Sequence, residues 1–379
     1  MKIMPLSVFL FISVIATSIS SHANANPTLE LKANQTFSKT IADNKRLLAR
    51  QFADSYATAN LALKHYINHR DLSVSTDKIY QTNKKLLNRS NQMIRIAKGL
   101  NSSGENLIQL RIASKQMIPA WKNGSDPLFA FSPEGDEKQW TGIEAFDTDG
   151  NVHFLDVYTL PTRPVFIVEL DGRKALREGL EVMRNLFSAR EGELSRSSIL
   201  ETGFTEPLST TVLKHIRLEN DEEPWILGKA EVYAVTNGIS PSRDEPVLDV
   251  VDMPYLDHDG VDYYPNQILF FWDRYRWQAA DAILMEHDDN TNFKEIASNL
   301  LEIAAQILQS IPSPDVQGYA IIAIITNGIL EALPDEWFIN NDDYVDSFYT
   351  TFENQEYTNR RGARNNATVT LKPLTIDPR

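Results

Sequence analysis

Cysteine is absent from this chain of 379 residues. Without a thiol the protein can form no disulfide, cannot use a cysteine nucleophile and cannot hold zinc through cysteine ligands. The chain is nevertheless long enough, with 42% hydrophobic residues, to build one large core or two to three smaller ones. We therefore expect at least two domains.

Long hydrophobic runs are lacking as well. After the first residues, no stretch approaches the roughly 20 apolar residues that a membrane helix needs. The most tempting segment, Ala320 to Leu333, is interrupted by Thr326, Asn327 and Glu331. We expect this segment to form a buried helix and the mature chain to have no transmembrane segment.

Positive charge is scarce, because 37 Lys and Arg stand against 51 Asp and Glu and give a net charge of −14 at pH 7. Nucleic acids and anionic membrane surfaces both favour a basic protein face, so this balance argues against them as partners. It is compatible with solubility, or with cation binding where the carboxylates cluster.

Familiar catalytic motifs are missing too. The chain has no Gly-x-Ser-x-Gly elbow, no glycine-rich phosphate loop and no dinucleotide-binding fingerprint. An enzyme is not excluded, since a carboxylate pair that hydrolyses glycosides can be recognised only from its geometry. The sequence therefore leaves open whether the protein is an enzyme.

The first residues have the pattern of a cleavable export signal. Lys2 precedes a short apolar run from Leu6 to Ala16, and Ala23-Asn24-Ala25 offers a small-x-small cleavage site. We expect residues 1–25 to be a signal peptide and the mature chain to begin near Asn26. The protein is then periplasmic or secreted.

Helical spacing dominates the next part of the chain. From Ser38 to about Trp121, apolar residues recur mostly at steps of three and four, which predicts two long helices with a break at Asp71 to Ser75. Turn residues from Asn101 to Gly104 end the second helix. The pattern predicts a helical region over residues 26–125.

Strand signals begin near Asp126, where short runs rich in Val, Ile and Phe alternate with Gly, Asp and Pro. Residues 126–195 are predicted to hold four strands and one helix, which Asp171 is expected to cap. Residues 196–379 are predicted to form a domain with strands and two helices, Phe293 to Ile311 and Asp315 to Leu333. Its predicted strands are Thr210–Leu218, Ile226–Val235, Val247–Val251, Ile268–Trp272, Ala282–Met285, Tyr344–Phe352 and Ala367–Leu371.

These patterns predict an α+β fold. A helical N-terminal region is followed by a small α/β middle region and by a C-terminal antiparallel β-sandwich with inserted helices. We found no internal repeat.

Three acidic clusters each touch the end of a predicted strand. If the sandwich brings these loops to one end, their oxygens can converge on calcium, which takes six to eight oxygen ligands. The expected ligands are Asp257, Asp259, Glu286, Asp288, Asp289, Asp342 and Asp343. The alternative is that Asp and Asn are ordinary turn residues here. His287, inside one such loop, is expected to form a hydrogen bond within the loop or to pair with a carboxylate.

Aromatic residues gather between Tyr263 and Trp277. We expect Phe270 and Trp272 to lie on one face of a buried strand and to point into the protein core, with Phe271 on the opposite face. Tyr275 and Trp277 follow the end of that strand. They are the candidates for contact with a partner protein or a glycan.

Four segments carry a family resemblance: Leu227 to Ala234, Asp252 to Asp257, Glu286 to Asn290 and Asp342 to Tyr349. Together they resemble an uncharacterised family of exported proteins from Gram-negative bacteria, and the likeness extends back to Pro127. This resemblance implies a periplasmic or secreted product with no known activity. The acidic loops are also loosely similar to those of calcium-binding sandwich modules of the C2 kind.

Three functions remain open at this point. The leading hypothesis is an exported, calcium-stabilised protein that binds a partner protein or a glycan. The second is a secreted hydrolase that depends on a metal or on carboxylates. The third is a structural or adhesive envelope component that assembles through the apolar stripe of its helical region.

Overall fold

A computed structural model describes residues 27–80, 84–135, 137–191, 206–219, 225–228, 231–242, 244–287, 289–312, 314–332 and 344–378. The chain divides into two units, residues 1–36 and residues 37–379. All contacts discussed below lie in the second unit. The predicted signal peptide lies outside the described residues.

The first sheet is mixed and takes its strands from both sides of the predicted boundary at residue 125. β3 and β6 are parallel, and every other neighbouring pair is antiparallel. The strand order is β1 (Ser73–Ser75), β2 (Ile108–Ile112), β6 (Val165–Leu170), β3 (Leu128–Phe131), β4 (Ile143–Phe146) and β5 (Val152–Leu155).

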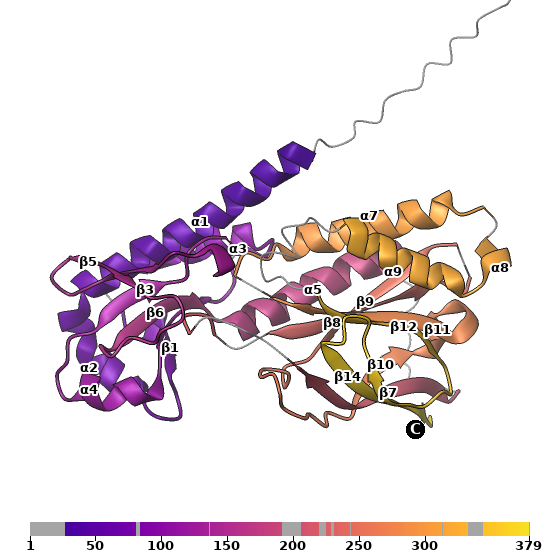
Figure 1. The fold of residues 1–379 in the computed structure, drawn as a ribbon. Coiled ribbons are helices and arrows are strands. Elements are labelled where there is room, and N and C mark those ends of the chain that lie inside the picture. Colours follow the sequence, from indigo (N-terminus) through magenta and orange to yellow (C-terminus); the bar gives the residue numbers. More distant parts are fainter. Residues whose placement is uncertain are drawn as a thin grey trace, which may run out of the picture. The chain divides into compact units, whose positions relative to one another are not determined.

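Four helices pack against this sheet (Figure 1). They are α1 (Pro27–Asp54), α2 (Tyr56–Tyr66), α3 (Lys84–Ala97) and α4 (Ile118–Lys122). Aromatic side chains join helices to strands: the Tyr56 and Phe129 rings meet edge to face at 5.8 Å, and Trp121 meets Phe166 at 5.0 Å. The Trp121 indole also donates a hydrogen bond to the Tyr56 hydroxyl at 2.9 Å. The apolar stripe predicted from the sequence is thus buried against the sheet.

Two four-stranded antiparallel sheets form the C-terminal sandwich. The β7 sheet has the order β10 (Gln267–Phe271), β7 (Leu208–Leu218), β14 (Ala367–Ile376) and β13 (Tyr357–Arg361). The β8 sheet has the order β12 (Tyr344–Phe352), β11 (Ala279–Glu286), β8 (Val232–Ile239) and β9 (Pro246–Asp252). Apolar side chains from both sheets, among them Leu213, Phe270 and Leu284, form one buried cluster between them.

Helices cover the outer face of the β8 sheet. α5 (Gly172–Glu191) and α7 (Phe293–Ser310) contact β9, whereas α9 (Ala320–Ala332) contacts β8, β11 and β12. As expected, the isoleucines of α9 are largely buried. Among the helices that the structure describes, none has both the length and the hydropathy needed to cross a membrane.

Local sequence signals explain several element ends. The Asp171 carboxylate accepts a hydrogen bond from the Lys174 backbone N–H at 3.1 Å, so the predicted cap of α5 is confirmed. Asn292 caps α7 in the same way through Glu295, at 3.2 Å. The single helix predicted from Asp315 to Leu333 is instead split into α8 (Pro314–Gln317) and α9, because Gly318 between them has φ +59°.

The α+β fold class is confirmed, but some predicted elements are wrong. The stretch up to Trp121 is not helical throughout, because β1 and β2 lie inside it. β2 alternates buried Ile108, Leu110 and Ile112 with polar residues, a period of two that flanking helical patterns obscured. β8 begins at Val232 rather than at Ile226. β13 was missed because its residues are mostly exposed and polar.

Candidate functional site

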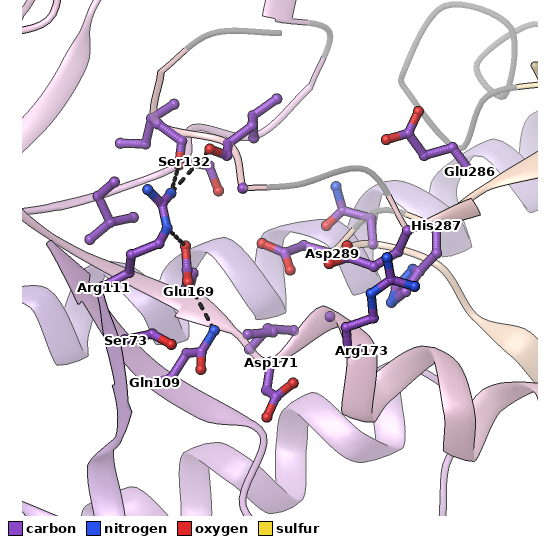
Figure 2. Close-up of a pocket in the computed structure, with 18 of the residues that line it drawn as sticks. Ser73, Gln109, Arg111, Ser132, Glu169, Asp171, Arg173, Glu286, His287 and Asp289 are labelled. Atoms are coloured by element: carbon purple, nitrogen blue, oxygen red, sulfur yellow. Dashed lines mark hydrogen bonds and ion pairs between the residues drawn. The ribbon is translucent and has the colours of Figure 1, made fainter. Parts of the chain in front are cut away.

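A cavity of about 600 Å³ lies between one face of the first sheet and one end of the β8 sheet. Its floor comes from β1, β2 and β6. Its walls come from the start of α5, from the loop after β3 and from the loops that precede β8 and follow β11 (Figure 2). Many of the lining side chains are polar or charged.

The floor is a polar face of a sheet. Strand register places Ser73, Arg111 and Ile167 side by side, and Gln109 beside Glu169. Neighbouring residues such as Leu110 point to the opposite, helix-covered face. One face of this sheet therefore contributes to the core and the other to the cavity.

Arg111 connects the floor to the loop that precedes β8. Its Nε donates to Glu169 Oε2 at 2.6 Å, and its Nη2 donates to the carbonyl oxygens of Ile226 and Leu227 at 2.8 and 3.1 Å. Gln109 donates to the other Glu169 oxygen at 2.9 Å. Burial raises the pKa of Glu169 even though Arg111 acts to lower it. A carboxyl group with a raised pKa beside a cavity is a common feature of functional sites.

The start of α5 forms a second part of the lining, through Asp171, Gly172 and Arg173. A Cβ atom built at Gly172 would lie only 2.4 Å from Glu231 Oε2, so the Glu231 carboxylate packs directly against the first turn of the helix. A carboxylate is stabilised there by the partial positive charge of the helix N-terminus.

His287 follows β11 and is almost fully buried. Its backbone N–H donates to the Glu231 carbonyl at 2.9 Å, and its Nδ1 lies 3.0 Å from the Thr291 hydroxyl. Burial, together with the charge of Lys98, holds the pKa of His287 well below its usual range. A neutral imidazole that hydrogen-bonds within its own loop agrees with one of the two roles expected from the sequence.

Asp289 contacts two lysines: Lys45 of α1, and Lys98, which directly follows α3. Lys45 Nζ donates to Asp289 Oδ2 at 2.6 Å and also to the hydroxyl of Ser132, while Lys98 Nζ donates to the Asp289 carbonyl at 2.9 Å. Burial would raise the pKa of Asp289, but the two lysine charges outweigh burial and lower it. Asp289 is therefore an ionised carboxylate at neutral pH.

Strand register places the strand ends that border the three acidic clusters of the sequence at one end of the β8 sheet. Glu286 pairs with Val232, Asp252 pairs with Tyr233, and Tyr344 pairs with Met285. The ends of β9 and β11 and the beginning of β12 therefore lie along the same sheet edge. This is the arrangement on which the calcium hypothesis depends.

The individual carboxylates are more dispersed than their loops. Glu286 and Asp289 line the cavity, whereas Asp257 and Asp259 do not, and Asp257 accepts a hydrogen bond from the Tyr263 hydroxyl at 3.0 Å. Asp288, Asp342 and Asp343 lie outside the described residues. Within the part of the chain that the structure describes, no three carboxylate or histidine side chains are grouped closely enough to hold a metal ion. Calcium binding stays a prediction.

The aromatic candidates have different environments. Phe270 and Trp272 are buried and Phe271 is 38% exposed, as expected from their alternation. Tyr275 was expected to meet a partner, but it is only 2% exposed and its hydroxyl lies 3.0 Å from that of Thr236, so it belongs to the core and this expectation is wrong. Trp277 is partly buried, under the Arg276 guanidinium at 5.6 Å, and its role stays a prediction.

Sequence reasoning missed Lys45, Arg111, Ser132, Glu169 and Glu231. Two signals were available: Glu169 is the only charged residue in the run Val165–Leu170, and Arg111 alternates with apolar residues in β2. A charge at such a position in a strand indicates a polar inner face. Lys45 gave no signal, because a lysine in an amphipathic helix is usually solvated.

The fold and the cavity together define an α+β protein with an open, partly polar pocket between an N-terminal mixed sheet and a C-terminal sandwich. The chain belongs to the family described as Protein of unknown function (DUF3103), whose model matches residues 45–379. That match includes every residue that lines the cavity. No curated protein and no solved structure matches the chain.

Proposed function

We propose that this is an exported binding protein that holds a small polar molecule, carrying both a positive and a negative group, in the cavity. The observation that supports this most strongly is the polar inner face of the first sheet. A sheet face turned toward the protein interior is normally apolar, since buried polar groups destabilise unless they are paired. The cavity volume of about 600 Å³ lies within the range of small-molecule sites.

The charges of the lining support a ligand with two opposite groups. Glu231 and Glu286 bring carboxylates to the lining that attract an amine, and Arg70 and Arg173 bring guanidinium groups that attract a carboxylate or phosphate. Glu169 and Asp289 add an ion pair each, with Arg111 and Lys45. A zwitterion would satisfy both signs at once, whereas a neutral molecule would leave charges desolvated.

The test is thermal unfolding of the mature chain with amino acids and dipeptides, which are zwitterions at neutral pH. A ligand at 100 times its dissociation constant adds about 2.7 kcal/mol to the free energy of unfolding. Glu286→Gln and Arg173→Gln should each weaken the stabilisation. Glu356→Gln, an exposed residue next to β13, is the matched control and should not. The proposal fails if no zwitterion stabilises the protein, or if the cavity variants respond like the control.

Calcium binding at the end of the β8 sheet is the second candidate, supported by the register that brings the ends of β9 and β11 and the beginning of β12 to one sheet edge. Thermal melts in chelator and in excess calcium test it. A calcium-specific rise in melting temperature that is lost in Glu286→Gln and Asp289→Asn would support a site at these loops. Equal melting temperatures in chelator and in calcium would mean that these carboxylates bind no calcium and are ordinary turn residues.

An envelope component that assembles through its helical region remains a third proposal, but with less support. Leu48, Phe52 and Leu63 of α1 and α2 pack into the core of the chain itself, whereas Leu61 is 83% exposed. They therefore offer little apolar surface for assembly with another molecule.

A further inference from the structure

Ser132 stands at the end of β3 and lines the cavity, and only 8% of its surface is exposed. Its hydroxyl accepts a hydrogen bond from the ammonium of Lys45, which is 2% exposed. A buried lysine that reaches a serine hydroxyl at the wall of a cavity combines a nucleophile with a base. We propose that Ser132 and Lys45 are the nucleophile and general base of an acyl-transfer site, which hydrolyses small esters or amides in this cavity.

To take the serine proton, Lys45 must first give up one of its own, and the Asp289 carboxylate that pairs with it then needs another counter-charge. The Asp289 carboxylate lies 2.6 Å from Lys45 Nζ and feels the charge of Lys98 as well. Lys98 is fully buried, and its ammonium lies 2.9 Å from the Asp289 carbonyl oxygen. When Lys45 is deprotonated, Lys98 still offsets the negative charge of Asp289. Lys98 thus remains as a positive charge acting on Asp289 during the step in which Lys45 serves as the base.

The reaction balances without an external oxidant or reductant. Ser132 Oγ attacks the carbonyl carbon of the substrate while its proton moves to Lys45 Nζ. The bond from that carbon to the leaving oxygen or nitrogen breaks, and Lys45 donates the proton to the departing alcohol or amine. Water then attacks the acyl carbon and gives a proton to Lys45. The bond from that carbon to Ser132 Oγ breaks, and Lys45 returns the proton to Oγ, which releases a carboxylic acid and restores the serine.

The cavity restricts the substrate class. It admits a small molecule rather than a folded protein, and its lining favours an ester or amide that carries charged groups. The inference therefore rests on the proposed binding function. It differs in requiring a reactive hydroxyl at Ser132, which ligand binding alone does not need.

A purely structural role makes different predictions. In that case Lys45 only links α1 to the loop after β11 through Asp289, and Ser132 is an ordinary hydrogen-bond acceptor. Lys45→Arg separates the two roles, because a guanidinium keeps the ion pair with Asp289 but is not deprotonated near neutral pH. Ser132→Ala removes only a hydroxyl. Ser102→Ala, an exposed serine in the turn before β2, is the matched control.

The experiment treats the mature protein with a fluorophosphonate probe and with p-nitrophenyl acetate, and locates the label by peptide mass. We expect one label on Ser132, and rates at least about 100-fold lower in Ser132→Ala and Lys45→Arg. Ser102→Ala should react like the wild type. An unlabelled wild type, or full labelling of either cavity variant, would overturn the inference.

The same variants separate this inference from the binding proposal. Stabilisation of Ser132→Ala by a zwitterion, measured by thermal unfolding, tests binding with the nucleophile removed. If that stabilisation persists while the wild type shows no labelling, the cavity binds but the acyl-transfer inference is wrong. If labelling depends on Ser132 while no zwitterion stabilises any variant, the catalytic inference stands and the ligand class is wrong.

Discussion

The interior of the sandwich and the floor of the cavity are both sheet faces turned inward, yet they are built differently. Between the β7 and β8 sheets, a cluster of apolar side chains that includes Leu213 and Phe270 fills the space. On the first sheet, Gln109, Arg111 and Glu169 face a cavity of about 600 Å³. An inward face that serves only stability is packed and apolar, whereas one that carries charges beside open volume indicates a site.

Buried carboxylates sharpen the same comparison. Asp346 on β12 is fully buried, and its two oxygens accept four backbone N–H groups, from Ser347, Arg364, Asn366 and Ala367, at 2.7–2.9 Å. A Cβ at Gly362 would lie 2.2 Å from its carboxyl carbon, so no open volume adjoins it on that side. Asp346 follows the calcium candidates Asp342 and Asp343 in the sequence, yet it holds the turn before β14.

The largest effect is expected from Asp346→Ala. Four backbone donors in a buried turn would lose their acceptor, so we expect the free energy of unfolding to fall by about 3–5 kcal/mol. Urea unfolding measures the change. Asp273→Ala, an exposed carboxylate after β10, should stay within about 0.5 kcal/mol of the wild type. Equal losses in both variants would mean that the Asp346 contacts contribute little.

Two adjacent residues of β2 test the two faces of the first sheet. Leu110→Ala opens a cavity in the core and should cost about 2–5 kcal/mol, while leaving the lining of the site intact. Arg111→Met should cost less but abolish ligand binding, and adding Glu169→Gln should restore most of the lost stability, because it removes an unpaired buried carboxylate. Urea unfolding and ligand titration of the three variants check this. A double variant no more stable than Arg111→Met would contradict it.

Asp281 gives an intermediate, pH-dependent effect. Burial raises its pKa to about 6, although Thr326 and the Thr350 N–H donate hydrogen bonds to it at 2.6 Å. A raised carboxyl pKa stabilises the fold below the unfolded-state value of 3.8, and this contribution is lost as the pH rises through about 6. The loss is at most about 3 kcal/mol, since a tenfold change in proton affinity corresponds to about 1.4 kcal/mol. In the wild type, the free energy of unfolding measured in urea should fall between pH 4 and pH 7, and Asp281→Asn should reduce this fall. If the fall is unchanged in the variant, groups other than Asp281 cause it.

The smallest effect is expected at the surface. Glu356 and Lys372 form an ion pair of 2.9 Å, with about half of each side chain exposed. Such a pair is screened by water and salt, so Glu356→Gln should leave the unfolding midpoint in urea unchanged within error at physiological ionic strength. A clear shift would show that exposed ion pairs, and not only the buried faces of the sheets, contribute measurably to the stability of this protein.

The sequence predicted elements whose pattern is local. The helix after Asp171 and the alternation of Phe270, Phe271 and Trp272 depend on neighbours within a few residues, so periodicity and capping rules apply to them. β13 was missed because its strand conformation depends on pairing with β14 rather than on its own residues. Tyr275 was misplaced because the turn that carries it inward, where Trp277 has φ 58°, has no sequence signal that we recognised.

The candidate site is mostly non-local, which explains why so little of it could be predicted. Lys45, Ser132 and Asp289 come from three parts of the chain that are up to 244 positions apart. Only Glu286 and Asp289 were selected in advance, because acidic loops at strand ends are visible in sequence. Polar residues such as Ser132 and Lys45 look like solvated surface until the tertiary fold encloses them.

Gly172 gives the site an unusual sensitivity to a single methyl group. Because Glu231 Oε2 would lie 2.4 Å from a Cβ at this position, any larger residue there must push the carboxylate away from the helix and toward the open volume. Gly172→Ala would then displace one of the carboxylates proposed to bind the amine and reduce the accessible space, while the net charge of the protein stays the same. Residue 172 is therefore a point at which one added methyl group can change both the shape of the site and the position of its negative charge.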